Sequence, residues 1–175
     1  MTTKAKQHKR ELPADLLERL SRYIEENYEA PEPAEAVLYE QEAELSMPIE
    51  ACRAESLEEV LDHLGESFQE RLLRFIDERG LTDPEVYKAA NIDRKLFSKI
   101  RCNKDYIPKK KTILALCIGL KLNLDDARDL LATAGLALSN SSRSDLIVMF
   151  CLENQHYDIY EVNALLDQLG EKTLN

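Results

Sequence analysis

The sequence predicts an all-α protein, and three observations carry that prediction. Apolar residues recur every three to four positions through most of the chain, and helix-favouring Ala, Leu, Glu, Lys and Arg predominate. Pro, Gly, Asn and Ser-x-x-Glu signals separate these periodic segments. We expect an acidic helical extension over residues 1–65, a five-helix domain over 66–139 and a helical hairpin over 140–175.

The N-terminal extension is strongly acidic. Residues 11–65 contain 16 Asp or Glu against 3 Lys or Arg, a local charge of −13 in a chain whose net charge is −10. Residues 1–10 instead carry four bases and no acid, which predicts a disordered tail. The acidic region is a candidate surface for a protein partner.

Two helices are expected within this extension. An amphipathic helix is predicted over 13–29, and its acidic polar face favours packing or dimerisation over anchoring to an anionic membrane. A linker rich in Pro, Ala and Glu follows over 30–50. Ser56 and Glu59 then form a capping box that opens a short helix over 56–64.

Sharp start and stop signals divide the central domain into helices. Thr82 and Asp93 are expected to cap the second and third of them. Gly80 is placed to end the first, and Asn91 can adopt left-handed backbone in the turn between the second and third. The predicted helices cover residues 66–79, 84–90, 94–101, 109–120 and 124–135. Their expected core is Leu72, Ile76, Val86, Ile92, Phe97, Ile100, Ile113, Leu116, Leu120 and Leu130.

The C-terminal hairpin is expected to consist of helices over 144–154 and 158–169. Its apolar content is too dense to stay exposed, so the hairpin should pack on the central domain or on a second subunit. A homodimer is favoured because two-fold dimers are the commonest soluble oligomers. The run Leu146 to Phe150, taken alone, is also compatible with a buried strand.

The third predicted helix and its following loop are cationic. Residues 94–111 contain eight Lys or Arg and one acid, a local charge of +7. By helical periodicity Leu96, Phe97 and Ile100 share one face, and the basic side chains share the other. Such a helix can enter the major groove of double-stranded DNA while neighbouring cations hold phosphates. The candidate DNA-binding residues are Arg94, Lys95, Ser98, Lys99, Arg101, Lys104, Lys109 and Lys110.

A family pattern is matched by Gly80-Leu81-Thr82, Val86, Ile92 and Phe97-Ser98-Lys99-Ile100. Through these residues the chain resembles the lambda-repressor-like helix-turn-helix family of xenobiotic-response-element type. The resemblance covers about residues 66–135 and implies that fold and a role in DNA binding. The same stretch is similar to a C-terminal module of bacterial macro-domain proteins, which implies a bacterial or phage-related source and does not indicate an activity.

Three positions depart from the family pattern, which has Gln, Ala and Gly where this chain has Asp83, Tyr87 and Asn91. An acid at position 83 would weaken DNA binding unless it pairs with Arg94 or Lys95. The helix N-termini expected near residues 84 and 109 could add phosphate contacts through free backbone N–H groups.

The sequence lacks the motifs of common enzymes and metal sites. It has no Gly-rich phosphate loop, Gly-x-Ser-x-Gly elbow or HExxH, and its 4 Cys and 3 His lack the spacing of metal ligands. We therefore expect no catalysis, no cofactor and no metal, and we expect Cys117 to be a core residue. No apolar run reaches the roughly 20 residues of a membrane span, which predicts a cytoplasmic protein without a membrane partner.

Two functions fit these features. The first is a sequence-specific DNA-binding regulator that uses the basic helix. The second is an interaction protein, an adaptor or a neutralising partner in a toxin or phage-defence setting, with the helix-turn-helix as scaffold. A third possibility joins them: residues 11–65 fold over the basic helix and inhibit it.

Overall fold

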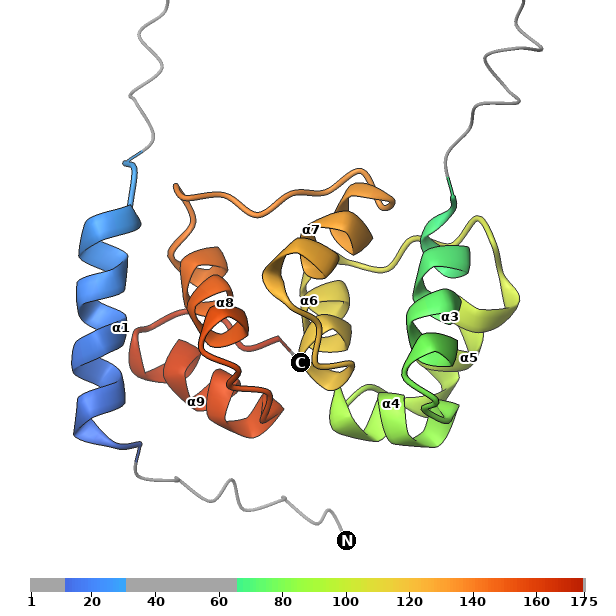
Figure 1. The fold of residues 1–175 in the computed structure, drawn as a ribbon, viewed down its shortest axis with the longest axis horizontal. Helices are drawn as coiled ribbons and strands as arrows, with labels where there is room; N and C mark the ends of the chain where they lie inside the picture. Colours follow the sequence, from blue (N-terminus) through green and yellow to red (C-terminus); the bar gives the residue numbers. More distant parts are fainter. Residues whose placement is uncertain (1–11, 31–65, 175) are drawn as a thin grey trace, which may run out of the picture. The chain divides into compact units, whose positions relative to one another are not determined.

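The structure is a computed structural model that describes residues 12–30 and 66–174 (Figure 1). These residues form eight α-helices and no strand, which confirms the all-α class. The tail over 1–10, most of the predicted linker and the short helix predicted over 56–64 lie outside the described residues. The helices are α1 (Ala14–Asn27), α3 (Phe68–Glu78), α4 (Asp83–Ala89), α5 (Arg94–Cys102), α6 (Lys110–Gly119), α7 (Leu124–Ala132), α8 (Arg143–Glu153) and α9 (Ile159–Gln168).

Side-chain caps fix where the helices of the central domain begin. Thr82, the predicted cap of α4, forms a capping box with Glu85, in which the Thr82 N–H donates to the Glu85 carboxylate at 2.8 Å. The Asp93 carboxylate accepts a first-turn backbone N–H of α5 at 2.7 Å, also as predicted. Ser67 and Glu70 form a further capping box at α3, which was not among the predicted caps.

Left-handed residues end α3 and separate α4 from α5. Gly80 has φ +60° and Asn91 has φ +51°, as their sequence positions predicted. The Ile92 N–H donates to the Tyr87 carbonyl at 2.8 Å, which closes the end of α4. The turn therefore holds α4 and α5 close together with only residues 90–93 between them.

Helix α6 is buried along most of its length. Every residue from Ile113 to Gly119 is buried, and α4, α7 and α9 all pack against this helix. Helix α5 packs on α3 and α4. Nine of the ten predicted core residues are buried, and Ile92 is half-buried because it lies in the turn before α5.

Helix α8 is the second buried helix. Residues Asp145 to Leu152 are all buried, and α1, α7 and α9 pack against them. The run Leu146 to Phe150 is therefore helical, and the strand alternative is wrong. The predicted hairpin of α8 and α9 packs within the chain, so covering its apolar side chains requires no second subunit.

Helix α1 covers one side of α8 in the ribbon of Figure 1. It buries Leu16, Leu20 and Ile24, which confirms the packing face predicted for this amphipathic segment. The Tyr23 ring meets the Phe150 ring edge-on with centroids 5.4 Å apart. Burial, with a smaller contribution from the adjacent Glu153 carboxylate, raises the pKa of Tyr23 to about 12.

The apolar anchor of α5 gives the first stability prediction. Phe97 is 3% exposed, so Phe97→Ala should lower the free energy of unfolding by about 3–5 kcal/mol through lost burial and a residual cavity. Urea unfolding would measure this change. Lys95→Ala, on the exposed face of the same helix, should change stability by less than about 0.5 kcal/mol. Equal effects of the two variants would contradict the assigned faces.

The crossing of α4 and α6 gives the second prediction. A Cβ at position 119 would lie 2.8 Å from the Ala90 backbone nitrogen and 2.9 Å from the Ala90 Cβ. Gly119→Ala should therefore destabilise the fold by about 1–3 kcal/mol. Ala90→Gly removes one of the two clashing atoms, so the cost of Gly119→Ala should fall by at least about 0.5 kcal/mol in that background. Strict additivity in a double-mutant cycle would contradict the close contact.

Candidate nucleic-acid interface

The candidate interface is built on α5, whose apolar side is fixed in the core. Phe97 and Ile100 are buried, and the Tyr87 ring of α4 packs against the Phe97 ring with centroids 5.9 Å apart. Tyr87, a departure from the family pattern, is thus a packing residue. The four predicted contact residues on the other face of α5 are all exposed: Arg94, Lys95, Ser98 and Lys99.

The C-terminal end of α5 is tied to neighbouring helices. Arg101 forms an ion pair with Asp83 at 2.5 Å, and its carbonyl accepts a hydrogen bond from the Gln69 side chain. Asp83 therefore pairs with Arg101, and not with Arg94 or Lys95. The pair neutralises Asp83 at the start of α4. It also neutralises Arg101, which is one of the predicted DNA-binding residues.

The loop after α5 is held by two further cations. Lys104 pairs with Glu70 at 2.8 Å, so the loop is fastened to the first turn of α3. The hydrogen bond from Lys104, followed by those from Ser67, lowers the pKa of Glu70 to about 2, and the same contact raises the pKa of Lys104. The Lys99 ammonium lies over the Tyr106 ring, 3.9 Å from its centroid.

Lys110 connects α6 with α8. Its ammonium forms an ion pair with Asp145, whose side chain is buried and also accepts the Ser139 N–H at 2.9 Å. A carboxylate placed in the interior needs such partners to offset its desolvation. Among the predicted contact residues, Lys110 thus has a clear structural role.

Five cations of the segment form no ion pair with any of residues 12–30 and 66–174, and one of them, Lys99, lies over the Tyr106 ring. The other four are exposed and make no ring contact in this part of the chain: Arg94, Lys95, Lys109 and Lys111. They lie in the first turn of α5 and at the start of α6. Lys111 belongs to the cationic segment but was not among the predicted contact residues. Because it is exposed, it joins the candidate contact residues.

The two helix N-termini proposed as phosphate sites differ. The start of α4 carries Asp83 and the Glu85 capping box, so its positive end is already matched by acids. Helix α6 begins after Lys109 with no side-chain cap and no acid in its first turn. The start of α6 therefore retains backbone N–H groups suited to an anion.

Known proteins provide no assignment. Comparisons with protein-family models, curated proteins and solved structures give no match to this chain. The proposal for the interface therefore depends on its geometry and charge.

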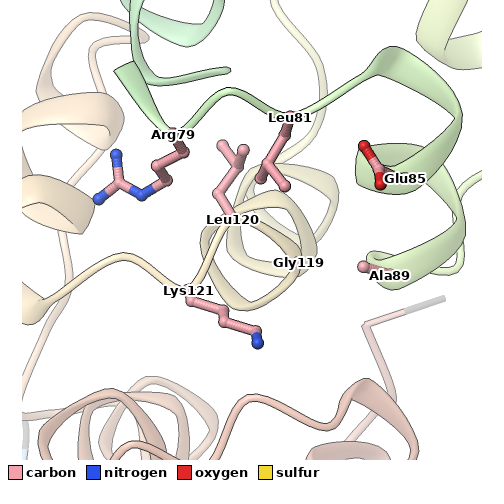
Figure 2. A pocket seen from close by; sticks show the side chains of 7 residues that line it. All are labelled: Arg79, Leu81, Glu85, Ala89, Gly119, Leu120 and Lys121. Atoms are coloured by element: carbon pink, nitrogen blue, oxygen red, sulfur yellow. The ribbon is translucent and has the colours of Figure 1, made fainter. Parts of the chain in front are cut away.

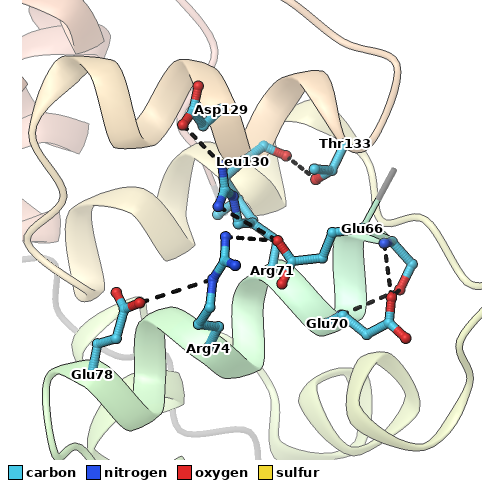
Figure 3. Close-up of polar contacts among 9 residues, drawn as sticks. Glu66, Glu70, Arg71, Arg74, Glu78, Asp129, Leu130 and Thr133 are labelled. Carbon is cyan, nitrogen blue, oxygen red and sulfur yellow. Dashed lines mark hydrogen bonds and ion pairs between the residues drawn. The ribbon is translucent and has the colours of Figure 1, made fainter. Parts of the chain in front are cut away.

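The arginines of α3 differ from Arg94 and Lys95 of α5. Both α3 arginines form ion pairs within one network (Figure 3). Arg71 contacts Asp129 at 2.9 Å and Glu66 at 3.5 Å, which joins α3 to α7. Arg74 contacts Glu66 at 2.8 Å and Glu78 at 3.9 Å. These pairs make the outer side of α3 a structural surface.

A pocket of about 420 Å³ lies where α4 meets the end of α6 (Figure 2). Two of its charged side chains are engaged elsewhere: Arg79 pairs with Asp126 at 3.0 Å, and Glu85 caps α4. Because Arg79 and Glu85 already have partners, the pocket does not indicate a particular class of ligand. The residues that line it are Arg79, Leu81, Glu85, Ala89, Gly119, Leu120 and Lys121.

Thiols and carboxylates form no metal centre in the part of the chain that the structure describes. Burial raises the pKa of the Cys117 and Cys151 thiols to about 12, so both remain protonated at neutral pH, and Cys117 is the core residue predicted. None of the described helices has the length and apolar character required to cross a membrane.

The Glu70–Lys104 contact gives a pH-dependent prediction. The pKa of folded Glu70, at about 2, lies below its ordinary value, so the ionised carboxylate stabilises the fold above about pH 4.3 and that contribution is lost as the pH falls toward 2. Wild type should be more stable than Glu70→Gln at neutral pH, and the gap should narrow below about pH 4. Urea unfolding at a series of pH values measures the gap, with exposed Glu26→Gln as control. A gap that is constant with pH would contradict the ionic contact.

Proposed function

We propose that this protein is a sequence-specific DNA-binding regulator in which α4 and α5 form a helix-turn-helix and α5 enters the major groove. One observation carries the proposal. Helix α5 buries Phe97 and Ile100 while its opposite face presents cations that no described acid neutralises. In a chain of net charge −10, such a surface suits a polyanion.

The positions of the free cations suit the two tasks of DNA recognition. Arg94 and Lys95 lie in the first turn of α5, and Ser98 follows one turn later. The N-terminal part of a recognition helix is the part that meets base edges. Lys109 and Lys111, beside the uncapped start of α6, are placed to bind phosphates.

The arrangement of the helices supports the same proposal. A turn over residues 90–93 joins α4 to α5, and α6 is buried behind α4. This order supports the proposed lambda-repressor-like five-helix fold over α3 to α7. We further propose a homodimer, because a two-fold axis matches DNA half-sites of opposite orientation.

Salt-dependent binding tests this proposal. Full-length protein should bind duplex DNA in fluorescence anisotropy, with log K falling linearly as log salt rises. Lys109→Ala should lower that slope by about 1, because one phosphate contact is lost. Arg94→Ala should cost about 1–3 kcal/mol on a selected site and relax sequence preference.

The matched control is Arg128→Ala, which removes an exposed arginine from α7. It should leave affinity and salt slope unchanged. Unchanged binding by an Arg94→Ala, Lys109→Ala double variant would refute the assigned interface. The full chain is the appropriate form for these measurements because α1 covers buried residues of α8.

One observation favours the alternative of an interaction protein. Helix α1 is fixed through Leu16, Leu20 and Ile24, and its outer face exposes acids. A basic protein partner could bind that face while α3 to α7 act as scaffold. Under this hypothesis, full-length protein fails to bind duplex DNA even at low salt. The exposed acids are Asp15, Glu18, Glu25 and Glu26.

A further inference from the structure

We infer that Ile107 makes an apolar contact with duplex DNA beside α5, an inference that rests on the proposed function. Three large hydrophobic side chains are prominently exposed among residues 12–30 and 66–174: Tyr28 at 40%, Ile107 at 53% and Tyr160 at 62%. Ile107 is the aliphatic one, with no polar atom in its side chain. It also lies inside the cationic segment, in the loop between α5 and α6.

Both neighbours of Ile107 are anchored, which holds its side chain outward. Tyr106 is half-buried, packs against the core and lies under the Lys99 ammonium at 3.9 Å. Pro108 is buried. The Tyr106 N–H donates to the Asn103 carbonyl at 3.2 Å, which fixes the preceding turn. Turning Ile107 inward would disturb these contacts, so the loop presents it on the surface.

The surroundings of Ile107 identify the partner chemistry. Lys99 reaches the loop at position 106, and exposed Lys109 follows two residues after Ile107. The partner should therefore be polyanionic and also offer apolar groups between its charges. Duplex DNA does so through thymine methyl groups and deoxyribose, and apolar side chains contact both grooves of DNA in this manner.

An anionic lipid surface would also match the charge, but the observations favour DNA. Membrane-surface binding draws on a broad apolar face that enters the headgroup region. Here one aliphatic side chain lies in a loop with exposed Asp105 and Lys109, beside a helix whose own apolar face is buried in the core. The area available for insertion is therefore small.

The test compares full-length wild type, Ile107→Ala and Tyr160→Ala by fluorescence anisotropy on a mixed-sequence duplex over a salt series. Ile107→Ala should bind about five- to ten-fold more weakly, because roughly half the apolar contact of an isoleucine is lost. The salt slope should stay unchanged, since no charge is removed. Tyr160→Ala, which truncates another exposed large side chain, on α9, should match wild type.

A second duplex, with deoxyuridine in place of thymidine, separates the two apolar sources. If Ile107 contacts a thymine methyl, wild type loses affinity on this duplex and Ile107→Ala does not. If it contacts deoxyribose, the loss caused by Ile107→Ala is the same on both duplexes. Either result supports the contact. Thermal unfolding of the variants verifies that each is folded.

Several results would overturn the inference. If wild type and Ile107→Ala have equal affinity while Lys109→Ala still lowers the salt slope, the Ile107 contact is refuted and the proposed function stands. If wild type does not bind duplex DNA, both the contact and the proposed function are refuted. Binding to phosphatidylglycerol–phosphatidylcholine vesicles that Ile107→Ala abolishes, with duplex affinity unchanged, would make the loop a lipid contact instead.

Discussion

The burial of α6 on several sides is the constraint on which the rest of the structure depends. A helix whose residues 113–119 are all apolar or small cannot face water, so other helices must surround it. Helices α4, α7 and α9 supply that cover. The contact with the end of α4 is close because Gly119, which has no side chain, lies against Ala90. The positions of α4 and its short turn then determine where α5 lies, and so which face of α5 meets solvent.

Helix α8 must also be covered by other helices, and α1, α7 and α9 pack against it. The two buried helices are joined by the pair of Lys110 at the start of α6 and Asp145 in the first turn of α8. A buried carboxylate is costly without partners, and the Ser139 N–H supplies a further one. The pair thus fixes the relation of one buried helix to the other, and it takes one lysine out of the cationic surface.

Ion pairs with other helices divide the cations of residues 94–111 into those that pair with described acids and those that do not. Arg101, Lys104 and Lys110 are neutralised by acids from α4, α3 and α8. The first two contacts hold α5 and its loop, and the third joins α6 to α8. Arg94, Lys95, Lys109 and Lys111 stay exposed on the same part of the fold. Charge density along the chain identified the region, but it did not separate these two sets. That separation carries the proposed function, because paired cations have less to gain from a phosphate.

The sequence by itself determined the helices and most of their ends. Caps at Thr82 and Asp93 and the left-handed turn at Asn91 act within three or four residues, so local patterns suffice to predict them. Periodicity likewise predicted the buried and exposed faces of α5. Tertiary structure alone decided which cations pair with described acids, because Arg101 meets an acid 18 residues away and Lys110 one 35 residues away. It also decided that a side chain at position 119 would clash with Ala90. No local pattern contains these contacts, since each exists only after packing brings separate helices together.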